Sequence, residues 1–110
     1  MTAAQFRKVA LSFAQATESS HHGHPDFRVG GKIFATLGYP DASCGVVMLD
    51  PDEQKFFMKI GGEAFFPAKG EWGRKGSTVV KLRAVKSALV LDALEAAWRR
   101  RAPKRLLETQ

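Results

Sequence analysis

Hydrophobic residues follow helical spacing in some segments of the chain and strand-like spacing in others. Near the N-terminus they recur three and four residues apart, at Phe6, Val9, Ala10 and Phe13, which is the pattern of an amphipathic helix. Thr2 and Gln5 have the spacing of a capping box that starts a helix. We therefore predict a helix from about Ala3 to Ala16, followed by a loop from Thr17 to Pro25.

Two β-prone runs follow, Asp26–Val29 and Lys32–Leu37, and the pair Gly30-Gly31 joins them. A type I′ turn needs positive φ at both central residues, so Gly-Gly between such runs predicts a β-hairpin. Residues along each run are expected to alternate between the two faces of the sheet. Arg28 then faces away from Phe27 and Val29, and in the second run Lys32, Phe34 and Thr36 face away from Ile33, Ala35 and Leu37.

The middle of the chain predicts a buried strand that leads into a helix. Residues from Cys44 to Leu49 form an apolar run suited to the interior of a sheet. Asp50 then has the position of an N-cap, with Pro51 at the first helical position and Glu53 completing a capping box. The helix is expected to end near Gly61-Gly62 and to bury a face made of Phe56, Phe57 and Ile60.

The last third of the chain predicts two further strands and a helix. The strands are expected at Glu63–Phe66 and Ser77–Leu82, with a loop at Ala68–Gly76 between them. Ser87 is expected to cap the final helix, which ends in Arg99-Arg100-Arg101 before a turn at Pro103. Its apolar positions have helical spacing, at Val90, Leu91, Leu94, Ala97 and Trp98.

These elements occur in the order α-β-β-β-α-β-β-α. Hairpin connections require antiparallel pairing, so the predicted fold class is α+β, an antiparallel sheet with packed helices. A chain of 110 residues suffices for one hydrophobic core. We therefore expect a single domain over residues 1–110.

Composition adds expectations about the environment of the protein. No apolar run approaches the roughly 20 residues that a membrane span needs, and the N-terminus lacks the pattern of a signal peptide. Cys44 is the only cysteine, which excludes an internal disulfide and fits a reducing compartment. We expect a cytoplasmic monomer that does not contact membranes.

The net charge of +6 is unevenly distributed along the chain. Residues 1–68 carry 6 basic and 7 acidic side chains, whereas residues 69–105 carry 11 basic and 3 acidic ones. A basic half indicates a polyanionic partner, such as nucleic acid, a phosphate-bearing ligand or an acidic protein surface. The alternative is that these charges only keep a small domain in solution.

The segment Glu71–Thr78 is the strongest candidate for a binding loop. Gly73 and Gly76 flank the Arg74-Lys75 pair, and a tryptophan, Trp72, precedes them. Glycines permit the tight turns that place such side chains at a loop tip, where binding residues concentrate. Trp72 could stack on a base or pack against the edge of the sheet, and the two cations could be part of a solvated turn.

Three histidines, His21, His22 and His24, lie within four residues of the predicted loop. Imidazole is a common metal ligand, but no cysteine or acidic cluster nearby completes a site, and a loop hydrogen-bonded to backbone or water explains them equally. Cys44 lies in a predicted buried strand, so it has the environment of a packing residue and not of a nucleophile. We expect no metal, no cofactor and no catalytic activity.

Three segments, Gly23–Ala35, Trp72–Gly76 and Ala102–Leu106, resemble the MmcQ/YjbR family of small bacterial proteins, in the family's order and over essentially the whole chain. The resemblance implies an α+β fold related to the secretion-chaperone-like and frataxin-like arrangements. It also implies DNA binding through two wing-like loops, which has been suggested for the family. The sequence departs from the family pattern near His22, where an aromatic residue is expected.

Under this hypothesis the wings contact phosphates with little sequence preference, and the partner is DNA. The nucleic-acid-binding residues are then predicted to be Arg28, Lys32, Lys69, Trp72, Arg74, Lys75, Lys81 and Arg83. The alternative is a protein-interaction or adaptor domain whose basic surface binds an acidic protein partner, by analogy with the secretion chaperones. A large exposed apolar patch would favour that alternative.

Overall fold

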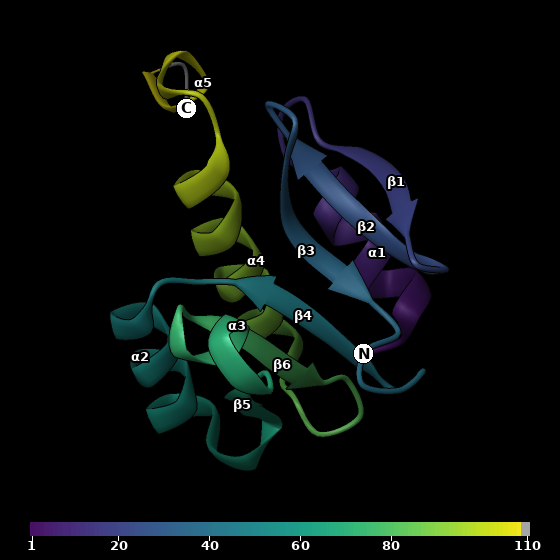
Figure 1. Ribbon diagram of the computed structural model, residues 1–110, viewed down its shortest axis with the longest axis vertical. Coiled ribbons are helices and arrows are strands. Elements are labelled where there is room, and N and C mark those ends of the chain that lie inside the picture. Colours follow the sequence, from purple (N-terminus) through teal and green to yellow (C-terminus); the bar gives the residue numbers. More distant parts are fainter. Residues whose placement is uncertain (109–110) are drawn as a thin grey trace.

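The computed structural model describes residues 1–108 and contains a six-stranded sheet in the order β1-β2-β3-β4-β6-β5 (Figure 1). Every neighbouring pair of strands is antiparallel. The predicted α+β class is therefore confirmed. The strands are β1 (Thr17–His21), β2 (His24–Val29), β3 (Lys32–Leu37), β4 (Cys44–Met48), β5 (Phe65–Pro67) and β6 (Ser77–Lys81). The helices are α1 (Ala3–Leu11), α2 (Pro51–Gly61), α3 (Gly70–Arg74), α4 (Ser87–Arg101) and α5 (Lys104–Glu108), with a 3-10 turn, η1, at Gly62–Ala64.

The two faces of the sheet are covered differently. Helices α1 and α4 lie behind the sheet in Figure 1, and the short helix α3 lies in front of it. The main core fills the α1/α4 side and includes the fully buried side chains of Phe6, Phe27 and Trp98. A smaller apolar cluster, with Cys44 and Val46 among its members, lies on the other face. The burial predicted for Cys44 is confirmed.

Local sequence signals correctly predicted the starts of two helices and the central hairpin turn. Thr2 and Asp50 both form complete capping boxes, at the starts of α1 and α2. Gly30 and Gly31 have φ values of 59° and 78°, as a type I′ hairpin turn requires. The hairpin of β2 and β3 is therefore confirmed, with Phe27 and Val29 buried in the core.

The segment predicted as a loop before this hairpin is instead an edge strand. Helix α1 ends at Leu11, where the Ser12 hydroxyl bonds the Val9 carbonyl, and Gln15 then turns the chain with a φ of 56°. β1 pairs with β2 along its whole length. Its side chains are nearly all exposed, so it has no hydrophobic alternation from which a strand could be predicted.

Three other predictions were wrong in detail. A register shift between Phe27 and Arg28 breaks the expected alternation and brings Phe34 into the core together with Ala35. The residue that caps α4 is Lys86 and not Ser87. The apolar faces of α2 and α4 are narrower than expected, because Phe56, Ile60 and Leu91 are exposed.

The predicted loop Ala68–Gly76 contains α3, which is held against the sheet by close backbone approach. A Cβ atom on Gly73 would overlap the Ala68 carbonyl oxygen, and one on Gly76 would overlap that of Leu49. The buried Gln54 side chain of α2 donates to the carbonyl oxygens of Gly73, at 3.0 Å, and Ser77, at 3.1 Å. These contacts place Trp72 over the outer face of the sheet.

No helix within residues 1–108 combines the length and apolar character needed to cross a bilayer.

The close approach at Gly73 generates a stability prediction. Gly73→Ala forces α3 away from Ala68 and lowers the free energy of unfolding by about 1–3 kcal/mol, the usual cost of overpacking a buried site. Urea denaturation followed by circular dichroism measures the change. The control Glu71→Ala, on an exposed position of the same helix, changes stability by less than about 0.5 kcal/mol. Equal midpoints for the two variants would show that the backbone contact does not constrain α3.

Candidate functional site

A groove of about 650 Å³ lies between the β2–β3 hairpin, α3 and the C-terminal end of α4. Five cationic side chains line it, and none of the described residues that line it is acidic. We call this feature the basic groove; its charged residues are Arg28, Lys32, Lys75, Arg100 and Arg101. Concentrated like charge on a concave surface attracts anions and raises their local concentration.

The groove exists because the hairpin turn meets the segment after α4. Gly30 lies so close to Pro103 that a Cβ atom on Gly30 would be 2.9 Å from the proline Cγ. This contact brings the end of α4, with Arg100 and Arg101, to the hairpin that carries Arg28 and Lys32. The three segments that resemble the MmcQ/YjbR family thus meet at or beside the groove.

Arg101 is the cation with the most unusual environment. Its Nε atom is buried and has no hydrogen-bond partner among the described residues. Burial, and to a smaller extent the charge of Arg100, lowers the pKa of Arg101 from its usual value, although an arginine remains charged in any protein. A buried charged donor without a partner is costly, and an anion in the groove would reduce that cost.

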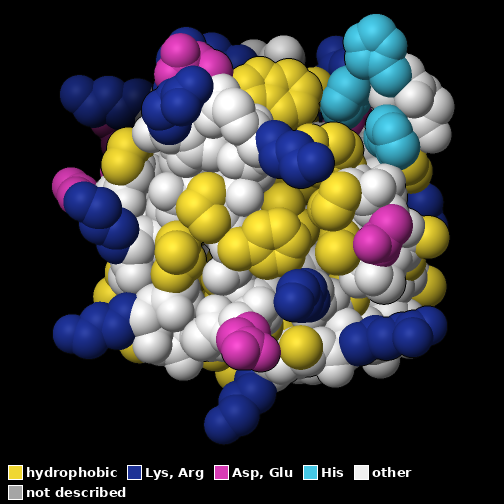
Figure 2. Space-filling view, turned by 60° about the horizontal axis from the view of Figure 1, so that its bottom comes forward, with side chains coloured by type: hydrophobic (Ala, Val, Ile, Leu, Met, Phe, Trp, Pro, Cys, Tyr) yellow, Lys and Arg dark blue, Asp and Glu magenta, His cyan; other side chains and the backbone are white. Residues whose placement is uncertain are grey.

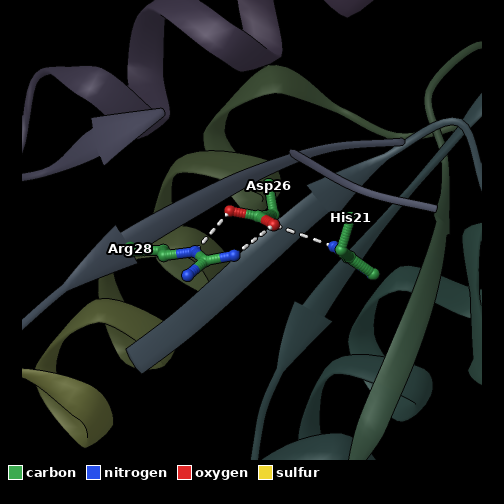
Figure 3. Close-up of polar contacts among 3 residues, drawn as sticks. All are labelled: His21, Asp26 and Arg28. Atoms are coloured by element: carbon green, nitrogen blue, oxygen red, sulfur yellow. Dashed lines mark hydrogen bonds and ion pairs between the residues drawn. The ribbon is translucent and has the colours of Figure 1, made fainter. Parts of the chain in front are cut away.

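Arg28 is held by Asp26, as Figure 3 shows. Its Nε and Nη2 atoms donate to the two carboxylate oxygens at 2.8 and 3.0 Å, and His21 Nδ1 lies 2.8 Å from Oδ2. The Asp26 side chain is completely buried. The hydrogen bond from Arg28 lowers the pKa of Asp26, outweighing the opposite effect of burial, and that from His21 lowers it further. Asp26 is therefore ionised at neutral pH.

A second cavity, of about 220 Å³, adjoins the groove on the outer face of the sheet. We call it the histidine pocket, because its lining residues are His21, His22, His24, Thr36, Tyr39, Val46, Met48, Ala68 and Trp72. Trp72 and Met48 line both cavities. Figure 2 shows the three histidines together at one edge of a face whose centre is hydrophobic and whose margin carries lysines and arginines.

The histidine cluster has a carboxylate partner that the sequence did not indicate. Asp26, five residues after His21, is a carboxylate partner that the spacing of the loop did not suggest, because the β1–β2 pairing brings the two together. Among residues 1–108, no group of three or more His, Cys, Asp or Glu side chains is placed to hold a metal ion.

Four of the eight predicted binding residues lie in the basic groove: Arg28, Lys32, Trp72 and Lys75. The structure does not bring the other four to it. Arg74 pairs with Glu71 on the exposed side of α3, and Lys69 precedes that helix. Lys81 lies 5.5 Å from the centre of the Phe66 ring, and Arg83 lines a separate cavity near the N-terminus.

Trp72 is 58% exposed, so it does not pack fully against the edge of the sheet.

Arg100 and Arg101 were absent from the predicted set, because cations at a helix C-terminus are already explained by the helix dipole. The run of three arginines was the available signal, but only packing against the hairpin distinguishes the two that line the groove.

The Asp26 contacts predict a pH-dependent stability. The pKa of Asp26 is lower in the folded protein than its ordinary value of 3.8. Its stabilising contribution is therefore complete above that value and is lost as the pH falls through the lowered pKa. We expect Asp26→Asn to reduce the free energy of unfolding at pH 7 by about 1.5–3 kcal/mol, as for hydrogen bonds to charged groups, and the deficit to shrink in acid.

Urea titrations from pH 7 to pH 2.5 measure this effect. The control Asp92→Asn removes an exposed carboxylate from α4 and should leave the pH dependence almost unchanged. A deficit in Asp26→Asn that grows in acid would contradict the sign of the pKa shift.

Comparison with known proteins agrees with this architecture. A search of curated proteins found no match. The crystal structure of Deinococcus radiodurans protein DR2400, which contains a DUF419 domain, has a TM-score of 0.73 and 16% sequence identity, over 88% of this chain and 75% of the other. That likeness shows the fold. The YjbR family model matches residues 11–100, and the chain therefore belongs to the YjbR family.

Proposed function

We propose that this protein binds nucleic acid through the basic groove. The observation that carries the proposal is the arrangement of five cations along one concave surface that has no acidic residue in its lining. Arginine and lysine form strong charge-assisted hydrogen bonds with phosphate oxygens, and such contacts position a protein on a nucleic acid. The Nε of Arg101 is buried without a hydrogen-bond partner among residues 1–108, and the negative charge of a phosphate in the groove would offset the cost of burying that cation.

Binding of this kind is governed by the sugar-phosphate backbone. Each phosphate contact releases condensed counterions, so the affinity falls steeply with salt. Backbone contacts carry no direct information about sequence. The groove therefore favours affinity for DNA with little sequence preference.

A pair of charge-matched double variants tests the proposal. Lys32→Gln/Lys75→Gln removes two exposed cations of the groove, and Lys55→Gln/Lys59→Gln removes two exposed cations of α2. Fluorescence anisotropy of labelled DNA, single-stranded and duplex, is measured across a salt series. The groove variant should lose affinity and reduce the slope of log K against log salt by about 1–2, as expected for two phosphate contacts.

The α2 variant should keep the slope of the wild type, although both variants have the same net charge. The proposal is wrong if the wild type binds neither form of DNA at low salt, or if the two variants lose affinity equally.

One observation supports the alternative of a protein-interaction domain. Phe56 and Ile60 lie one turn apart on α2 and are 56% and 47% exposed. Exposed apolar side chains grouped on one surface are typical of binding sites for protein partners. This surface is separate from the basic groove, so a loss of DNA binding in the groove variant would not depend on it.

A further inference from the structure

We infer that the histidine pocket receives an unpaired base of the bound strand, so that the preferred ligand is single-stranded nucleic acid. The inference rests on the proposed function, since the basic groove must hold the phosphates beside the pocket. Nothing in the phosphate contacts alone distinguishes a single strand from a duplex. The adjoining pocket supplies that distinction.

The two cavities are neighbours, because Trp72 and Met48 line both. A nucleotide has the same division, because its charged phosphate is joined through a sugar to a flat and largely apolar base. The exposed indole of Trp72 lies where the base of a groove-bound nucleotide would enter. Aromatic side chains beside a positively charged groove are the usual means by which proteins bind single strands.

The size and lining of the pocket fit one planar ring system. Its volume of about 220 Å³ is below the range of roughly 300–1,000 Å³ typical of sites for drug-sized ligands. Val46, Met48 and Ala68 provide apolar walls, and Tyr39 and Trp72 provide aromatic ones. In a duplex, a base would have to leave its stack and its partner before entering, which is unfavourable. Unpaired bases avoid this cost.

Asp26 also determines which nitrogen of His21 is available in the pocket. Its ionised carboxylate can only accept hydrogen bonds, so Nδ1 of His21 carries the proton in the 2.8 Å contact. In the neutral ring Nε2 is then an acceptor, and it has no hydrogen-bond partner among residues 1–108. An acceptor on the pocket wall suits the amino and imino N–H groups that unpaired bases expose.

The test uses three labelled DNAs with the same number of phosphates: a mixed-sequence single strand, the same strand with abasic sites at its central positions, and a duplex hairpin. The variant is Trp72→Ala, and the control is Phe56→Ala, an exposed aromatic outside both cavities. Anisotropy at constant salt gives the affinities. The wild type should bind the intact single strand most tightly.

Trp72→Ala should weaken binding of the intact strand by about 5- to 150-fold, the range for loss of one stacked base. It should leave binding of the abasic strand nearly unchanged, and Phe56→Ala should change neither. A second readout is tryptophan fluorescence. Trp98 is 1% exposed, so quenching by a base would come from Trp72, with the intact strand and not with the abasic one.

The outcomes distinguish failure of the base-binding inference from failure of the proposed function. If all three DNAs bind the wild type equally and Trp72→Ala has no effect, the base-binding inference is wrong while the phosphate-binding groove stands. If none of them binds at low salt, the proposed function fails and the inference fails with it. Equal loss of the intact and abasic strands in Trp72→Ala would show that Trp72 supports the groove and not a base, which also overturns the inference.

Discussion

The Asp26 carboxylate is completely buried, and the two side chains that hydrogen-bond to it line different cavities. Arg28 belongs to the basic groove and His21 to the histidine pocket. Burying a lone carboxylate would be prohibitively costly, so the buried position of Asp26 depends on its hydrogen bonds with Arg28 and His21. One ionised group thus determines the rotamer of a groove cation and the tautomer of a pocket imidazole.

Close backbone approach determines where the cavities form. The hairpin turn at Gly30 abuts Pro103, and α3 rests on the carbonyl oxygen of Ala68 because Gly73 has no side chain. These two contacts bring four walls together: the hairpin, α3, the end of α4 and the outer face of the sheet. Glycine is required at both places because any Cβ atom would separate the elements that form the cavities.

The local electrostatic potential of this protein depends more on where its positive charges lie than on how many there are. The chain has 17 lysines and arginines, but only five line the basic groove. Several others have local roles, such as the pairing of Arg74 with Glu71 and the placement of Lys81 over Phe66. Charges that are widely spaced on a convex surface add little to the local potential, whereas charges gathered on a concave surface reinforce one another.

The sequence by itself determined the elements whose signals are local. Capping boxes at Thr2 and Asp50 depend on residues three apart, and the Gly30-Gly31 turn depends on two adjacent φ angles, so these could be predicted without knowledge of the fold. The polar strand β1 and the short helix α3 carry no such local signal. Pairing with β2 stabilises β1, and close packing against Ala68 stabilises α3. Only the tertiary structure decided that Trp72 and His21 line one cavity, and that Arg101 and Arg28 line another. These neighbours are about 50 and 70 residues apart in sequence, and packing of the core, which depends on the whole chain at once, is what brings them together.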